Sequence, residues 1–244
     1  MIQKNKDLII WIGETESTNS YLKNRLSEEK LPNGTLVVAD YQIKGRGQKG
    51  NSWYSSEAKN LLFSLLVYPD QILAKEQFVL SQVASLAIKR VMNSYADNFS
   101  IKWPNDIYWN DRKIAGILIE NNLEDEYIQS SIIGIGLNIN EDEFPGNLPN
   151  PVSLKQIIGQ DSDRKQLMYV VMQEFQALFN CLAAGEKEKI EEEYLQSLYR
   201  ANGYYPYKDI NGEFMAKIEG ILPSGHLLLR PYEDKEIKTY NRIK

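Results

Sequence analysis

The sequence predicts an α+β fold, in which a mixed and mainly antiparallel sheet carries helices on one side and is followed by a small C-terminal β-barrel. Short apolar segments with strand character outnumber the helical segments, and short polar turns between neighbouring strands are typical of antiparallel pairing. At Gly203 the pattern changes to short strands punctuated by glycine and proline. With 244 residues, of which 43% are hydrophobic, the chain can bury one large core and add a small second domain. We therefore expect a main domain over residues 1–202 and a β-barrel domain over residues 203–244.

In the first hundred residues, strands and helices alternate. The apolar run LIIWIG predicts a strand over residues 8–13, and a hydroxyl side chain then caps a predicted helix over residues 17–30. A strand over residues 35–42 leads directly into a glycine-rich stretch, and a strand over residues 60–69 ends at a proline. Residues 72–96 have apolar positions at helical spacing and predict a long helix.

The second part of the chain returns to strands. The expected strands cover residues 99–104, 106–109, 113–121 and 130–140, with the polar turn NDRK before the third. The proline-rich segment EDEFPGNLPNP is expected to be a loop that crosses to two helical stretches ending near Arg200. This order places most of the strands next to an antiparallel neighbour.

Composition excludes several classes of function. Twenty-eight basic and 33 acidic side chains leave a net charge of -5, so there is no overall electrostatic attraction to nucleic acid or to an anionic membrane. One cysteine and one histidine exclude internal disulfides, cysteine-rich zinc sites and motifs that need two histidines. The chain has no signal-type region and no apolar stretch of membrane-spanning length, so we expect a cytoplasmic protein with no membrane partner.

The stretch KGRGQKGNSW, residues 44–53, contains a glycine-rich nucleotide motif that its context does not support. The spacing G-x-G-x-x-G is present, but no helix is predicted after it, and Asn51 stands where a P-loop needs lysine. What remains is a flexible loop with cations, including Arg46, among three glycines, and with Trp53 at its end. Glycines let backbone amides approach an anion, and arginine binds phosphate or carboxylate in a bidentate way. The alternative is a solvated hairpin loop without a ligand.

A second dense segment is IKWPNDIYWNDRKIAGILIE, residues 101–120. Asn105 and Asp106 follow a Trp-Pro pair that fixes a bend, and Lys113 enters a strand whose other residues are apolar. A lysine in a core strand requires an anionic partner. The alternative is that Lys113 lies in water at the edge of a hairpin, while Asn105 and Asp106 only shape the turn.

Taken together, these motifs resemble the biotin protein ligases. The resemblance covers nearly the whole chain, through ESTNSYL, DYQIKGRGQKGNSW, KWPNDIYWNDRKIAGILIE, IGIGLNIN and the glycine-punctuated C-terminal region. It implies a sheet like that of class II aminoacyl-tRNA synthetases, in the fold of the biotin and lipoate ligases, with an SH3-like C-terminal β-barrel. It implies an enzyme that uses MgATP to activate biotin as biotinyl-5'-AMP and then transfers biotin to a lysine of a biotin carboxyl carrier protein, a subunit of a biotin-dependent carboxylase. Because LIIWIGETESTN starts the catalytic part at once, the chain resembles the short form that lacks an N-terminal DNA-binding domain, and we expect no direct DNA binding.

The resemblance also assigns roles to individual residues. Arg46 and Lys113 are the expected catalytic cations. Biotin is expected to contact both of them together with Ser17, Thr18, Asn19, Gln42, Gly45 and Gly116. ATP and the adenylate are expected to contact both of them together with Gly47, Trp53, Asn105, Asp106 and Asn138. No residue is a certain metal ligand: Mg²⁺ is expected to be held mainly by phosphate oxygens, with Asp106 as the candidate protein ligand.

Some features depart from the family or stay open. Many relatives carry a more arginine-rich loop, where this chain has Gln48 and Asn51, so we expect biotinyl-AMP to escape faster. The C-terminal arginine that lies near ATP in the family has no secure counterpart, because YNRIK can align in more than one way. A lipoate or octanoate ligase or transferase and a non-catalytic biotin- or nucleotide-binding regulator are the alternatives. The chain is compatible with a monomer or a homodimer.

Overall fold

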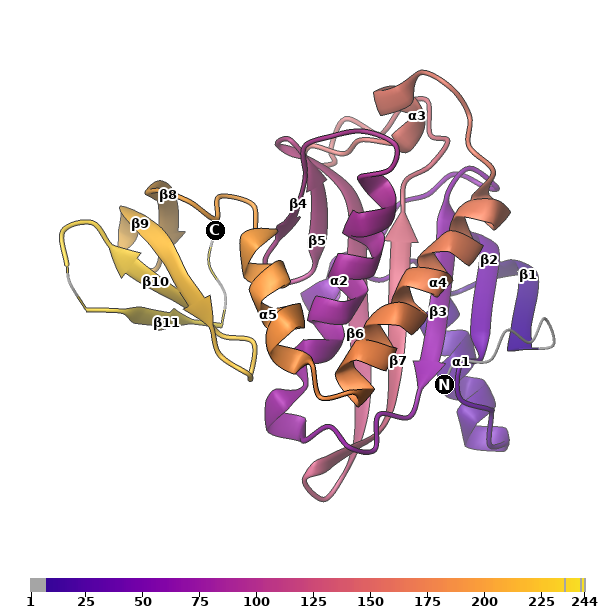
Figure 1. The fold of residues 1–244 in the computed structure, drawn as a ribbon. Coiled ribbons are helices and arrows are strands. Elements are labelled where there is room, and N and C mark those ends of the chain that lie inside the picture. Colours follow the sequence, from indigo (N-terminus) through magenta and orange to yellow (C-terminus); the bar gives the residue numbers. More distant parts are fainter. Residues whose placement is uncertain (1–7, 235, 242, 244) are drawn as a thin grey trace.

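The computed structural model describes residues 8–234, 236–241 and 243, and its main feature is a mixed sheet of seven strands (Figure 1). The strand order is β1-β2-β3-β7-β6-β5-β4, and every neighbouring pair is antiparallel except β1 and β2. The strands are β1 Ile9–Thr15, β2 Leu36–Gln42, β3 Leu61–Val67, β4 Phe99–Lys102, β5 Asp106–Trp109, β6 Arg112–Glu124 and β7 Tyr127–Leu137. The expected α+β class with a mixed, mainly antiparallel sheet is confirmed.

Helices cover both faces of this sheet. They are α1 Thr18–Glu28, α2 Phe78–Met92, α3 Leu154–Ile158, α4 Arg164–Ala183 and α5 Lys187–Gln196. The core between the sheet and helices α2 and α4 contains Phe63 and Phe175, while Leu22 of α1 packs with Val37 and Leu66 in a separate cluster. Successive side chains of a strand point to opposite faces of the sheet. Strands β2 and β3 carry apolar side chains on both faces, so helices must pack against both faces to bury them. The expectation that all helices lie on one side is therefore wrong for α1.

Two helical segments differ from the sequence expectation. Helix α2 begins six residues later than predicted, because Leu73 pairs with Tyr127 and the residues after it form a short 3-10 turn. Helix α3 was not anticipated as a separate element. Its signal is nevertheless in the sequence, since Ser153 and Gln156 form a capping box and Gly159 ends the helix with a φ of 78°.

The C-terminal residues form a second, four-stranded antiparallel sheet in the order β11-β10-β9-β8. Its strands are β8 Tyr205–Asp209, β9 Gly212–Ile221, β10 Leu227–Pro231 and β11 Lys238–Tyr240. The sheet lies beside α5 in Figure 1, and the indole nitrogen of Trp103 ties it to the main sheet by donating to the carbonyl of Gly225 at 2.9 Å. Tyr240 Oη donates to Asp209 Oδ2 at 3.2 Å and so joins the two outer strands. The domain boundary at residue 202 stays a prediction. None of the helices in the described part of the chain is long and apolar enough to cross a bilayer.

Candidate active site

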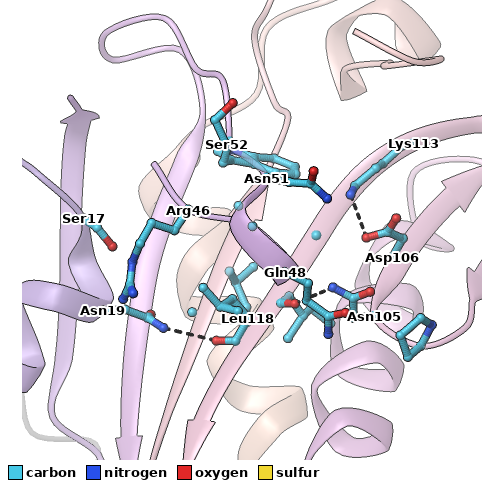
Figure 2. Close-up of a pocket in the computed structure, with 18 of the residues that line it drawn as sticks. Ser17, Asn19, Arg46, Gln48, Asn51, Ser52, Asn105, Asp106, Lys113 and Leu118 are labelled. Atoms are coloured by element: carbon cyan, nitrogen blue, oxygen red, sulfur yellow. Dashed lines mark hydrogen bonds and ion pairs between the residues drawn. The ribbon is translucent and has the colours of Figure 1, made fainter. Parts of the chain in front are cut away.

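A cavity of about 350 Å³ lies on the sheet face opposite α2 and α4 (Figure 2). Its wall combines the start of α1, the glycine-rich loop, β5, β6 and β7. Most of the predicted site residues line it, namely Ser17, Thr18, Asn19, Gln42, Arg46, Gly47, Trp53, Asn105, Asp106, Lys113 and Gly116. The structure therefore brings together motifs that are about a hundred residues apart in the sequence.

Three glycines of the sheet make room for side chains from outside it. A Cβ atom on Gly134 would lie 2.1 Å from Asn19 Oδ1, and one on Gly136 would lie 2.3 Å from the indole of Trp53. A Cβ atom on Gly116 would lie 2.8 Å from the same indole. Such distances are far below van der Waals contact. The alternation of glycine and isoleucine in IGIG thus gives one strand a core face and a bare face on which Asn19 and Trp53 lie.

A hydrogen-bonded group of polar side chains lies beneath the start of α1. The backbone N–H of Thr18 donates to Gln42 Oε1 at 2.7 Å. The hydroxyl of Ser64 is 2.6 Å from both Thr18 Oγ1 and Asn19 Oδ1, and Ser64 is fully buried. Ser64 was missed by the sequence analysis. A polar residue inside the otherwise apolar run NLLFSLLV was the available signal, because a buried hydroxyl must find a partner.

The glycine-rich loop folds back on itself. The N–H of Trp53 donates to the carbonyl of Gly45 at 2.8 Å, and a Cβ atom on Gly45 would lie 2.4 Å from the carbonyl oxygen of Trp53. Gly50 has a φ of 82°, which L residues rarely adopt. Only a three-residue 3-10 turn, Gln48–Gly50, forms here before β3. The expectation that no dinucleotide-binding helix follows the motif is confirmed; the side chain of Lys49 lies outside the described part of the structure.

The two predicted catalytic cations lie at opposite sides of the cavity (Figure 2). Lys113 Nζ forms an ion pair with Asp106 Oδ1 at 2.7 Å and lies 5.4 Å from the ring centroid of Trp53. Arg46 Nη2 instead donates to Glu120 Oε2 at 2.7 Å. Each cation therefore has its own carboxylate partner, and Lys113 is the one that shares its environment with an aromatic face.

Buried polar atoms at the site lack partners. The indole nitrogen of Trp53 and Oδ1 of Asp106 are buried and have no hydrogen-bond partner among the described residues. For Asp106 Oδ1, the contact with Lys113 is an ion pair that is not aligned as a hydrogen bond. The buried indole N–H of Trp53, which has no partner, favours a ligand that supplies a hydrogen-bond acceptor.

Other predicted residues have structural contacts. Asn105 lines the cavity and donates to the carbonyl of Ile117 at 2.7 Å, which fixes the turn before β5. Asn138 is buried outside the cavity wall and donates to the carbonyl of Val152 at 3.1 Å. Gly45 is also absent from the wall and acts through the shape of the loop. The part in adenine binding expected for Asn138 stays a prediction.

The chemistry of the wall also limits how a metal ion could be held. The described residues contain no group of three or more histidine, cysteine or acidic side chains placed to hold a metal ion. Within the described wall of the cavity, Asp106 is the only acidic side chain. A single carboxylate suits a Mg²⁺ ion that arrives on a polyphosphate and keeps water ligands, rather than one held in a protein cage.

The C-terminal tail reaches the cavity, which the sequence did not reveal. Asn241 and Ile243 are part of its wall, although they follow the last strand of the small sheet. Arg242, the candidate for the C-terminal arginine of the family, lies outside the described residues. Gln48 and Asn51, where the family resemblance led us to expect arginine, also line the cavity.

Fold and site together define a class of protein. A mixed sheet with one bare face, a glycine-rich loop over it, a lysine above an indole and a buried group of hydroxyl and amide side chains form an enzyme site for a polar small molecule with an anionic group.

Comparison with known proteins identifies the family. Residues 11–138 match the model of the biotin/lipoate A/B protein ligase family. The chain is 32% identical over 225 residues to the bifunctional ligase/repressor BirA of Bacillus spizizenii, covering 91% of this chain and 68% of that protein. It is 29% identical over 228 residues to the biotin–[acetyl-CoA-carboxylase] ligase of Paracoccus denitrificans, covering 90% of this chain and 92% of that protein. The structure of the biotin protein ligase from Aquifex aeolicus in complex with biotin and ATP superimposes with a TM-score of 0.80 at 28% identity, covering 99% and 98% of the two chains. The chain belongs to the biotin/lipoate A/B protein ligase family, among its biotin protein ligases.

Proposed function

We propose that the protein uses ATP to convert biotin into biotinyl-5'-AMP and then transfers the biotinyl group to a lysine of a biotin carboxyl carrier protein. One observation carries this proposal. A single cavity offers hydroxyl and amide groups around Ser17 and Asn19 at one side and the ammonium of Lys113 at the other (Figure 2), where the ammonium lies over the indole of Trp53.

The two sides of the cavity match the two ends of biotin. The ureido ring presents N–H donors and a carbonyl acceptor, which suit the hydroxyl and amide group that contains Ser17, Thr18 and Gln42. The apolar ring and chain suit the surface between these two sides, where the indole of Trp53 lies over Gly116 and Gly136. The carboxylate then lies toward Lys113. A ligand of this length and polarity needs both sides of the cavity at once.

In the first step, a carboxylate oxygen of biotin attacks the α-phosphorus of ATP, the bond between the α-phosphorus and the bridging oxygen breaks, and pyrophosphate leaves. Both reactants are anions, so their approach is unfavourable without a fixed positive charge. The ammonium of Lys113 is held between Asp106 and the ring of Trp53, and it supplies this charge without reorganisation. Magnesium, when bound with ATP, neutralises phosphate charge, and Asp106 is the side chain available to hold it.

In the second step, the ε-amine of the carrier lysine attacks the carbonyl carbon of the mixed anhydride, the bond to the phosphate oxygen breaks, and AMP leaves. The new amide nitrogen loses a proton. Asp106 is the only carboxylate in the described wall and is proposed as the proton acceptor. Replacement of Asp106 by asparagine is expected to change the pH profile of transfer from preformed biotinyl-AMP. An unchanged profile would remove this role and leave Asp106 as the partner of Lys113 alone.

The proposed function is tested by incubating the purified protein with biotin, MgATP and a carrier domain. Adenylate and carrier modification are measured separately, by chromatography and by mass. The wild type is expected to perform both steps. Lys113→Ala is expected to slow adenylation by roughly 10²- to 10³-fold, because it removes the fixed charge at the reacting phosphate. Lys44→Ala, which removes a 70% exposed lysine of the glycine-rich loop outside the cavity wall, is the matched control and is expected to be active.

The alternatives give different results in the same assay. Adenylation of lipoate or octanoate in preference to biotin would indicate a lipoate-type ligase. Biotin binding without adenylate formation would indicate a regulator. Adenylate formation without carrier modification would show that the carrier domain is not the partner.

A further inference from the structure

Glu120 of β6 lies at a junction between the glycine-rich loop and the start of α1. Its Oε2 atom accepts hydrogen bonds from Arg46 Nη2 and from Asn19 Nδ2, both at 2.7 Å. Glu120 ends the segment IKWPNDIYWNDRKIAGILIE, but no role followed for it from the sequence. It belongs to the same bare sheet face as Gly116 and Leu118, because side chains at every second position of a strand share a face.

Asn19 extends this junction into the polar group at the proposed ureido end. Its Nδ2 atom also donates to the carbonyl of Leu118 at 3.3 Å, and its Oδ1 atom lies 2.6 Å from the hydroxyl of Ser64. Ser64 in turn contacts Thr18, whose backbone N–H is bound by Gln42. A continuous series of hydrogen bonds therefore joins the guanidinium of Arg46 to the side chains proposed to hold the ureido ring.

We propose that Glu120 is a positioning residue that keeps the glycine-rich loop closed over bound biotin, and that the guanidinium of Arg46 is the group by which Glu120 holds the loop. This inference rests on the proposed function. In this arrangement Lys113 is the cation that meets the phosphate, and Arg46 acts through the position of the loop.

Geometry and burial support a tether of moderate strength. The side chains of Arg46 and Glu120 are 41% and 30% exposed, so their attraction is screened less than that of a fully exposed pair. Both donors converge on one carboxylate oxygen, and hydrogen bonds to ionised groups are the stronger kind. The same loop carries a second ion pair, between Lys44 and Glu16, whose side chains are 70% and 63% exposed. That pair is expected to contribute little, and it provides a matched control.

A double-mutant cycle on the intact chain tests the tether. The variants are Arg46→Gln, Glu120→Gln and the double variant, and the readout is the dissociation rate of radiolabelled biotin. Each single variant is expected to release biotin roughly 10-fold faster, and the double variant no faster than either single one, because each change breaks the same contact. Lys44→Gln and Glu16→Gln are expected to release biotin at the wild-type rate.

A second readout separates a tether from a phosphate ligand. At saturating biotin, Glu120→Gln is expected to form adenylate within a few-fold of the wild-type maximal rate and with an unchanged KM for ATP, while its KM for biotin rises. The charge-exchanged variant with Arg46→Glu and Glu120→Arg is expected to recover slow biotin release. Glu120→Asp, which keeps the charge but shortens the side chain, replaces Glu120→Gln where the latter fails to fold.

Two results would overturn the proposal. One is additivity of the Arg46 and Glu120 effects. The other is a Glu120 variant that releases biotin at the wild-type rate while Arg46→Gln raises only the KM for ATP. Failure of the proposed function is distinguishable from both, since the wild type itself would then form no biotinyl-adenylate.

Discussion

At the scale of single residues, the site depends on glycines of the sheet, which leave room for the side chains of Asn19 and Trp53. Gly136→Ala would place a methyl group 2.3 Å from the indole of Trp53, which would have to leave the sheet surface. We expect this variant to lose affinity for ATP and the adenylate while its melting temperature changes little, because the indole lies in a cavity rather than in the core. Isothermal titration with ATP and thermal unfolding measure the two effects.

The control for this prediction is Gly146→Ala. No heavy atom lies within 4 Å of the position that its Cβ would occupy. Wild-type nucleotide affinity in Gly136→Ala would show that Trp53 does not contact the nucleotide.

The site residues that could be predicted from the sequence differ physically from those that could not. Lys113 could be found because it begins an apolar run, and Ser17 because it precedes a helical pattern; both belong to recognisable motifs. Glu120 and Leu118 could not, because their part in the site depends on which strands are neighbours and on their register, and neither is visible in the local pattern.

At the scale of elements, the glycine-rich loop has a measurable deficit of positive charge. Gln48 and Asn51, which the family resemblance places at positions of arginine, line the cavity with neutral side chains. Gln48→Arg together with Asn51→Arg is expected to slow the escape of biotinyl-AMP by roughly 10-fold or more, since a charge-assisted hydrogen bond contributes about 1.5 to 3 kcal/mol. The release rate from isolated adenylate complexes is the measurement.

Ile43→Arg serves as the control for loop charge. Ile43 is 54% exposed, lies on the same loop and is not part of the cavity wall. If the variant with Gln48→Arg and Asn51→Arg released biotinyl-AMP at the wild-type rate, the charge argument would be contradicted. If Ile43→Arg slowed the release equally, the effect would come from net charge and not from arginines in the cavity wall.

Helices α2, α4 and α5 are joined by one arginine, and this predicts a pH dependence of stability. Arg90 makes two hydrogen bonds to Glu193, at 2.9 and 2.6 Å, and a third to Glu174 at 3.2 Å. The hydrogen bonds from Arg90 hold the pKa of Glu193 below its ordinary value of 4.5. A carboxyl group whose folded pKa is lowered stabilises the fold above its unfolded pKa, and this contribution disappears as the pH falls through the folded pKa.

Glu193→Gln is therefore expected to lower the melting temperature at pH 7, and the difference from the wild type should shrink as the pH falls below the ordinary carboxyl pKa of 4.5 and close once it passes the lowered pKa of Glu193. The pair is more than one third exposed, so its contribution is at most about 1 kcal/mol, or about 2 to 4 °C. Glu192→Gln, at the preceding position of α5, is the control. A difference that persists at low pH would assign the effect to packing instead of charge.

At the scale of the whole molecule, the small sheet contributes to the site through the chain that leaves it. Asn241 and Ile243 line the cavity after β11 has ended. Replacing both by alanine is expected to raise the KM for ATP by roughly 5-fold, which corresponds to about 1 kcal/mol of lost binding. Steady-state adenylation kinetics test this, with Ile210→Ala as the control, because Ile210 is fully exposed in the turn between β8 and β9. An unchanged KM would show that the tail only covers the cavity.

The order of the strands could be predicted from the sequence, whereas the position of α1 and the start of α2 could not. The order of strands along the chain followed from apolar runs separated by turn residues. The position of α1 on the opposite face did not, because it depends on β2 and β3 being apolar on both sides, which a local pattern shows only as a continuous run. The late start of α2 also depends on a contact between distant residues, because Leu73 pairs with Tyr127, which is far away in the sequence.

The position of Trp53 also has an optical consequence. Its indole lies in the cavity with a charged ammonium 5.4 Å from the ring centre, and a ligand that enters must change the polarity and the field around that ring. The fluorescence of Trp53, and of Trp103 in the same cavity wall, should therefore report each arrival and departure in the unlabelled protein, while Trp11, 42% exposed on β1 and outside the cavity wall, provides a steady background. The residue proposed to cover the reacting molecule is thus also expected to report its binding and release.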